Sequence, residues 1–435
     1  MNPGPCERVT GLFSYPARGG GRHFLKNFLV WEGARVRRLI ALLLGILTLA
    51  GCSGTRVVTG ESVLVGAKAP RIEAAQRGVY RPEADMTAEE TAEAYLEQMY
   101  LSYCQNELVD FTAILDTSEQ EIRYILLWTE ALLQRRRLLA ESGLCFVDTE
   151  KKPYAVAYIG QYDVEDERLW HLGKLAPDED EEAVVLHFVV EGEEGEAYPP
   201  ILASGAQHSV LLRKEDGVWK VAYHYFPGAL RKFGSAEGLD ERSDKETLAE
   251  LKVEFAACEE PETVPAPAGA KAYDGALAAR YAQTYLMEKN SDFYDVGDWM
   301  GNCQNYASQC VWWGFSAGAE PSVGAYDNMT AAWFAGSGGG SDAWEGVNSF
   351  WNYVGGGNGA LKASFPKGAA GLRAGDLVQT RSRSGEPDGG AFNHTLVVVD
   401  AEKKILAQNS PGCLLYYSDL LDAETRFVRP EYLLP

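Results

Sequence analysis

Cys303 and His394 are two residues that could carry out nucleophilic chemistry in this chain of 435 residues. Cys303 follows a Gly301-Asn302 turn, and apolar and small residues then recur at helical spacing as far as Gly314, which predicts a helix that begins at Cys303. A helix N-terminus stabilises a thiolate through its dipole and its backbone N–H groups. The same N–H groups, including that of Cys303, can hold an oxyanion. The pattern therefore predicts a nucleophilic cysteine.

His394 is the histidine that can act as a base for Cys303, because the sequence holds no other histidine between residues 272 and 435. It opens an apolar strand run, and after a turn a second strand ends at Gln408 and Asn409. Antiparallel pairing would bring Asn409, or Gln408, beside the imidazole and fix its orientation. This order predicts a Cys, His, Asn/Gln triad. The alternative is a buried core cysteine and a histidine at a strand end.

The remaining chemical groups of this C-terminal segment are expected to be structural. Six of the ten tryptophans lie between residues 272 and 435, which predicts an aromatic core with one or two rings able to stack on a substrate. Asp376 is expected to turn the chain into a strand rather than to act as an acid. Cys310 and Cys413 are expected to be buried neighbours or a disulfide, since a second nucleophile would lack a second base.

Several motifs follow one another through this segment: YDGALAARYAQTYLMEKN, the Cys303-centred GNCQNYASQCVWWG, a Trp-rich middle, GDLV at 375–378 and FNHTLVVV. In this order, from residue 273 to about 425, they resemble the putative amidase domain family, a branch of the papain-like cell-wall amidohydrolases and peptidases. Asn302 stands where an acidic residue commonly precedes the cysteine of that family, and Gly-rich insertions at 336–340 and 355–357 also depart from its pattern.

The resemblance implies a papain-like α+β domain in which the nucleophile helix packs on an antiparallel sheet. It implies amide-bond hydrolysis with Cys303 as nucleophile and His394 as general base and acid, without a cofactor or metal. Asn409 fits the polar third position of related families approximately.

The N-terminal segment has the features of a bacterial lipoprotein signal. Three arginines precede a twelve-residue apolar run, too short to span a bilayer, which ends in Leu49-Ala50-Gly51-Cys52. The sequence predicts a signal peptide over 1–51 and a diacylated Cys52 that anchors the protein to the outer face of the cell membrane. An ordinary signal peptide is the alternative. The stretch before the arginines is long, which suggests a start at Val30 or Val36.

Composition sets the class of the rest of the chain. It is 46% hydrophobic and 23% charged, as expected of a folded soluble protein with room for two or three domains. The net charge is −22 although the first 51 residues are basic, so a nucleic-acid partner is excluded by repulsion. Residues 52–85 are expected to be a tether, 86–230 a helix-plus-sheet domain, 231–271 a charged segment and Pro-rich linker, and 272–435 the amidase-like domain.

Two helices and a strand meander are predicted within 86–230. Capping boxes Thr87/Glu90 and Ser118/Glu121 begin the helices, and Gly143 ends the second. Strand runs follow at 154–159, 184–190, 208–213 and 219–225, with an Asp-Gly turn before the last. Helices followed by a sheet resemble the small NTF2-like domains. The histidines of these runs are expected to be core residues rather than ligands.

The cysteines and histidines lack the spacing of a metal site. No CxxC pair occurs, and the histidines are scattered, so the sequence has no recognisable zinc spacing and does not favour a metal hydrolase. Cys104 and Cys145 could be bridged in an oxidising compartment or simply buried, and Cys258 has no predicted partner.

These features predict an extracytoplasmic, lipid-anchored cysteine amidohydrolase or peptidase that cleaves an amide bond of cell-wall peptidoglycan through a thioester. The alternative is a binding module that kept the fold and lost turnover. A second alternative is acyl transfer to an amine, since an amine can resolve a thioester as water does.

Overall fold

The computed structural model of the chain describes residues 58–59, 79–83, 85–150, 152, 154–162, 182–193, 196–198, 207–226, 243–255, 265–294, 296, 301–382, 391–409, 412–421 and 423–435. The compact unit that holds these residues is Ser53–Pro435. The predicted signal peptide and its Cys52 lie outside the described residues, as does Cys258. No helix within the described ranges is long and apolar enough to cross a bilayer.

The first predicted helix is confirmed as α3, Ala88–Gln105. Thr87 caps it through the predicted box, since its side chain accepts from the Glu90 N–H while the Glu90 carboxylate accepts from the Thr87 N–H. The helix ends at Asn106 in the left-handed conformation, with φ 53°. Its apolar stripe is buried in the first core. The capping box therefore predicted the start of this helix correctly.

The second helix is α4, Gln120–Ser142, but its predicted capping box is wrong. Glu119 occupies the N-cap position without a side-chain cap. Ser118 instead belongs to an Asx turn, because its N–H donates to Asp116 Oδ1 at 3.0 Å. The predicted stop is confirmed, since Gly143 has φ 66°, which glycine adopts without strain.

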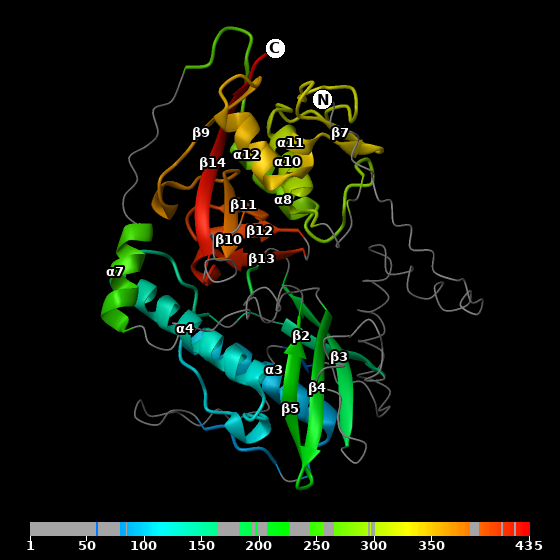
Figure 1. The fold of residues 1–435 in the computed structure, drawn as a ribbon, viewed down its shortest axis with the longest axis vertical. Helices are drawn as coiled ribbons and strands as arrows, with labels where there is room; N and C mark the ends of the chain where they lie inside the picture. The colour runs from blue at the N-terminus through cyan, green and yellow to red at the C-terminus, as the bar shows by residue number, and fades with distance from the viewer. Residues whose placement is uncertain are drawn as a thin grey trace, which may run out of the picture. The chain divides into compact units, whose positions relative to one another are not determined.

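The strand meander is confirmed as an antiparallel sheet with the order β1-β2-β3-β4-β5. Its strands are β1 Val58–Thr59, β2 Tyr154–Tyr162, β3 Ala183–Gly192, β4 Gln207–Glu215 and β5 Val218–Tyr225. Asp216 and Gly217 both have positive φ, as a two-residue hairpin turn requires. A short 3-10 turn, η1, lies at Thr112–Ile114. Helix α3 packs against the sheet (Figure 1).

A second antiparallel sheet forms the C-terminal part, with the strand order β13-β12-β11-β10-β14-β6 and β9 paired to β14. Its strands are β6 Lys271–Ala272, β9 Leu361–Ser364, β10 Leu377–Ser382, β11 His394–Asp400, β12 Ile405–Gln408, β13 Cys413–Tyr416 and β14 Ala423–Leu433. The hairpin predicted after His394 is confirmed, because β11 and β12 pair with Val397 opposite Ala407. The mixed α+β class predicted from sequence is therefore correct.

Helices from the C-terminal segment cover one face of this sheet. They are α8 Gly275–Thr284, α10 Cys303–Gly314, α11 Asp342–Glu345 and α12 Val347–Gly355, with a small hairpin of β7 Ala335–Gly336 and β8 Gly339–Gly340 (Figure 1). Trp312, Trp333 and Trp344 are at most 1% exposed in the core beneath them, so these three rings build the fold. Short 3-10 turns lie at Ala369–Gly371, η4, and Tyr417–Asp419, η5.

The opposite face of the second sheet is covered by α4 and by α7, Asp244–Glu254. Leu138 and Leu139 of α4, with Leu251 of α7, are buried in one core with strand residues such as Leu396 and Leu406. The upstream part of α4 packs with the first sheet, where Ile122 and Ile125 belong to the first core. One helix therefore contributes to the cores of both sheets.

Candidate active site

Cys303 lies at the first position of α10, as the sequence predicts. The helix ends at Gly314, where a Cβ atom would come within 2.3 Å of the Tyr273 ring, so only glycine fits this end. Cys303 is 3% exposed, and its Sγ donates to the carbonyl oxygen of Asn393 at 3.9 Å. The first N–H groups of an α-helix have no acceptor within the helix, so the N–H of Cys303 can donate to a bound oxyanion.

His394 opens β11 and pairs with Thr380 of β10. Its Nε2 lies 3.1 Å from the amide oxygen Oε1 of Gln408 on β12. An amide oxygen only accepts hydrogen bonds, so this contact places a proton on Nε2 and leaves Nδ1 of the neutral ring as the acceptor. The ring is thereby oriented for exchange of a proton with a neighbouring thiol.

The thiol of Cys303 has a pKa below its usual value. Burial alone raises this pKa, but the charge of His394 and a hydrogen bond with its imidazole lower it. Backbone N–H groups of Thr395 and Gln304 lower it further, and the favourable interactions outweigh burial. The structure therefore brings Cys303 and His394 together as a pair that favours the thiolate.

Cys310 and Cys145 lie in a different environment. Burial raises the pKa of the Cys310 thiol well above its usual value, and burial is also the main reason that the pKa of Cys145 is about 11. Among the described cysteines, Cys104 and Cys145 are thiols rather than a disulfide, as are Cys310 and Cys413. Cys104, Cys310 and Cys413 are buried, as the alternative to a disulfide expects, whereas Cys145 is half-buried.

Two amides were expected for the third position, and they have different partners. Gln408 contacts His394, whereas the side-chain oxygen of Asn409 accepts from Asn302 Nδ2 at 2.9 Å. The Asn302 oxygen in turn accepts from Asn305 Nδ2 at 2.8 Å. Asn409 therefore ties the end of β12 to the start of α10. Asn302, the residue before the cysteine, thus uses both ends of its side-chain amide in these bonds.

A row of buried polar residues under the nucleophile was not expected from the sequence. The side-chain oxygen of Gln304 accepts from Thr395 Oγ1 at 2.7 Å and from Gln379 Nε2 at 3.2 Å. Gln379 Nε2 also donates to the carbonyl of Val347 at 3.0 Å. These bonds fasten the first turn of α10 to β10 and β11. In the sequence, Gln379 and Thr395 are visible only as polar side chains within the two strands, without any sign of their partners.

Asp376 has the structural role that was expected. Its Oδ2 accepts from the Arg373 N–H at 2.8 Å, which closes the turn before β10. The same carboxylate forms an ion pair with Arg429 at 2.9 Å, with both side chains at most 4% exposed. Its hydrogen-bonding capacity is used within the fold, away from Cys303.

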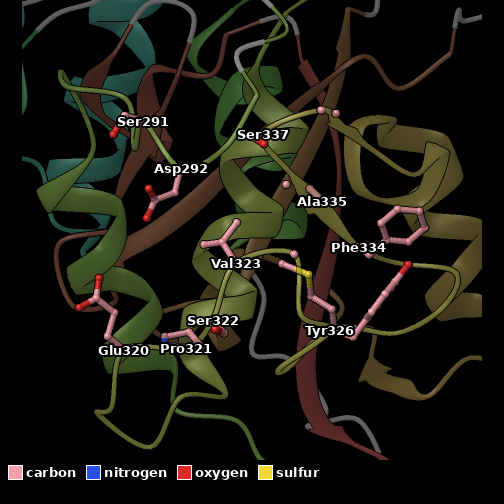
Figure 2. Close-up of a pocket in the computed structure, with 15 residues that line it drawn as sticks. Ser291, Asp292, Glu320, Pro321, Ser322, Val323, Tyr326, Phe334, Ala335 and Ser337 are labelled. Carbon is pink, nitrogen blue, oxygen red and sulfur yellow. The ribbon is translucent and has the colours of Figure 1, made fainter.

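A cavity of about 770 Å³ lies between the loops on the helical side of this region. Figure 2 shows Val323, Tyr326 and Phe334 around it, with the carboxylates of Asp292 and Glu320. Residues 336–339 of the Gly-rich insertion also line it, whereas Cys303 and His394 do not. The cavity is thus separate from the thiolate and imidazole.

The histidines of the first sheet are core residues, in line with expectation. His224 is 1% exposed; its Nδ1 lies 3.1 Å from the Tyr95 hydroxyl and its Nε2 lies 3.2 Å from His208 Nδ1. Burial, with a smaller effect of His208, holds the pKa of His224 well below its usual value. Within the described ranges, no group of three or more His, Cys, Asp or Glu side chains is arranged to hold a metal ion.

Comparison with known proteins finds similarity in the region that includes Cys303 and His394. The chain is 30% identical over 131 residues to the "Uncharacterized protein YhbB" of Bacillus subtilis (strain 168). That alignment covers 30% of this chain and 38% of the length of the relative. No solved structure matches the chain significantly. Residues 272–410 match the family model described as "Putative amidase domain", and this part of the chain is therefore an amidase-like domain.

Proposed function

We propose that this protein is a cysteine amidohydrolase in which Cys303 attacks the carbonyl carbon of an amide. The observation that carries the proposal is the Cys303 thiol at the start of α10, with a pKa lowered by His394, whose ring is in turn held by Gln408. The amidase-like character of residues 272–410 supports the same reaction class.

The reaction would proceed through a thioester. His394 takes the thiol proton, and the Cys303 sulfur forms a bond to the carbonyl carbon. The tetrahedral oxyanion accepts from the N–H groups at the start of α10, including that of Cys303. His394 then gives its proton to the leaving amine as the C–N bond breaks. Water, deprotonated by His394, releases the acid and restores the thiol.

The substrate that we propose is an amide bond of a cell-wall peptide, and the location is the outer face of a bacterial membrane. Support comes from the apolar run and the Leu49-Ala50-Gly51-Cys52 box, which is typical of a lipoprotein with an acylated cysteine. Such an anchor would hold the amidase-like domain next to peptidoglycan.

The thiolate is tested by the pH dependence of Cys303 alkylation with iodoacetamide in the compact unit 53–435. We expect wild-type protein to react at a pH below that of an ordinary thiol. In His394→Ala the burial of Cys303 is no longer opposed by the imidazole, so its pKa rises and the rate at pH 7 falls by about tenfold or more.

Hydrolysis is tested by mass spectrometry of peptidoglycan fragments incubated with the same protein and with Cys303→Ala. New amine and carboxyl termini in the wild-type digest alone support the proposal. An unchanged pH profile in His394→Ala, together with no cleavage, would favour a binding module. Products joined to an added amine would indicate acyl transfer instead.

A further inference from the structure

Arg426 lies on β14, level with Thr395 of β11, the residue that follows His394. Gln379 of β10 pairs with Thr395 on one side and with Arg426 on the other. Two strand spacings separate these backbones by about 10 Å. The Thr395 N–H interacts with the sulfur of Cys303, so Arg426 is within reach of a substrate bound at the nucleophile.

The guanidinium of Arg426 has unused donors in a fixed orientation. Its Nε donates to Gln379 Oε1 at 2.8 Å, and its Nη2 donates to Asn348 Oδ1 at 3.0 Å. Arginine has five N–H donors, so both hydrogens of Nη1 and one of Nη2 remain. The Trp351 ring lies 4.2 Å and the Phe392 ring 4.0 Å from its Cζ atom. Neutral amides and aromatic rings thus hold a fork that fits a carboxylate.

The charge of Arg426 has no carboxylate partner among the described residues. Two arginines on β14 and the adjacent β10 are paired: Arg429 with Asp376, and Arg381 with Glu424. Burial, and the charge of Arg381, lower the pKa of Arg426 to about 10. A partly desolvated cation is unfavourable without an anion, and a ligand carboxylate would supply one.

The segment that contains Phe392 and Asn393 connects Arg426 to the nucleophile. Asn348, which accepts from Arg426, donates through Nδ2 to the Phe392 carbonyl at 2.8 Å. Phe392 stacks on the guanidinium, and the next residue, Asn393, contacts Cys303 through its carbonyl oxygen. The fork and the thiol are therefore held by adjacent residues of one segment.

We infer that Arg426 is a substrate-binding residue that takes a carboxylate of the molecule whose amide is attacked by Cys303. This inference deepens the proposed function and rests on it. An extended peptide advances about 3.5 Å per residue, so the carboxylate would lie two or three residues from the scissile carbonyl. The substrate class is then a peptide with a free terminal carboxylate, or an acidic side chain, at that distance.

The test uses two thiol reagents of equal length that differ in charge: 6-maleimidohexanoic acid and its primary amide. We expect the acid to alkylate Cys303 about tenfold faster than the amide, because an ion pair with Arg426 orients it. In Arg426→Gln this ratio falls to about one, and Arg426→Lys gives an intermediate ratio, since lysine keeps the charge but not the fork. Cys303→Ala reports labelling of other cysteines.

Arg381→Gln is the matched control. Arg381 lies near the same ring of Phe392 but its charge is paired with Glu424, so its loss changes the ratio by no more than about twofold. Equal ratios in wild type and Arg426→Gln overturn the inference. An equal drop in Arg381→Gln also overturns it, because the preference would then come from general positive potential.

A second measurement does not depend on the thiol. Phenylglyoxal modifies arginine, and peptide mapping by mass spectrometry reports each residue. We expect 6-acetamidohexanoate to slow modification of Arg426 while 6-acetamidohexanamide does not. If Cys303 proves unreactive, the proposed function fails, and this protection alone decides the carboxylate site. Equal effects of the acid and the amide reject the site even if amide hydrolysis is found.

Discussion

Arg136 of α4 and Asp419 of η5 form an ion pair of 3.1 Å in which both side chains are completely buried. Tyr103 completes the cluster, since its hydroxyl donates to Asp419 Oδ2 at 2.5 Å and its ring lies 3.8 Å from Arg136 Cζ. Arg136 also donates to the Tyr103 hydroxyl at 2.8 Å, to Asn106 Oδ1 and to the carbonyl of Asp148. This buried cluster links α3 and α4 to η5, the turn that follows β13.

Removing the carboxylate from this cluster should strongly destabilise the protein. In Asp419→Asn the Arg136 charge stays buried without its counter-ion, and we expect the free energy of unfolding to fall by about 3–5 kcal/mol. Urea unfolding of residues 53–435 measures it. Asp244→Asn is the control, because its ion pair with Arg137 is exposed, and it should cost less than about 1 kcal/mol. Similar losses in the two variants would contradict the special role of the buried pair.

A fragment that begins at residue 265 should not fold as a stable monomer. It lacks α4 and α7, and so it exposes the sheet face that includes Leu396, Val398 and Leu406. We expect the fragment to self-associate in size-exclusion chromatography and to bind a hydrophobic dye, whereas the unit 53–435 is monodisperse and does not. A monomeric fragment with a cooperative unfolding transition would show that the helical layer is dispensable.

Gln408, rather than Asn409, should hold the orientation and the proton of the His394 imidazole. In Gln408→Ala the Nε2 of His394 loses its acceptor, so we expect kcat to fall on the order of tenfold with a small change in KM, and the pH profile to shift. Asn409→Ala removes the bond to Asn302 and should lower thermal stability more than it changes the pH profile. The reverse pattern would assign the third position to Asn409.

Alkylation near neutral pH should be selective for Cys303. Its thiolate fraction is raised because its pKa is lowered, while the pKa of Cys145 is about 11 and that of Cys310 is well above normal. As pH rises, Cys145 becomes reactive only near its own pKa, whereas the rate at Cys303 is already at its plateau. Peptide mapping after iodoacetamide treatment at several pH values checks this order. Equal labelling of Cys145 and Cys303 at pH 7 would contradict it.

Local patterns predicted the elements that hold the two central residues. The turn before Cys303, the helical spacing behind it and the Gly314 stop defined α10, and the alternation after His394 defined the β11–β12 hairpin. Such features depend on neighbours within about ten residues, which a single sequence displays.

What the sequence did not reveal depends on contacts between distant residues. The shared helix α4, the bond between Asn302 and Asn409, and the contacts of the Arg426 guanidinium each join segments far apart in the chain. The second capping box failed for a related reason, since Asp116 competed for Ser118. The sequence displays residues able to form these contacts, but it does not show which distant residue each of them contacts.

The tie between Asn302 and Asn409 has a further consequence for recognition. Because the start of the nucleophile helix and the end of the strand beside the base are bonded to each other, the thiol and imidazole are already arranged before any ligand arrives. Binding then needs little ordering of the protein, and a substrate gains no selectivity by assembling these groups. Under the proposed function, choice among amides must then come from side chains around this pair, such as Arg426, rather than from the pair itself.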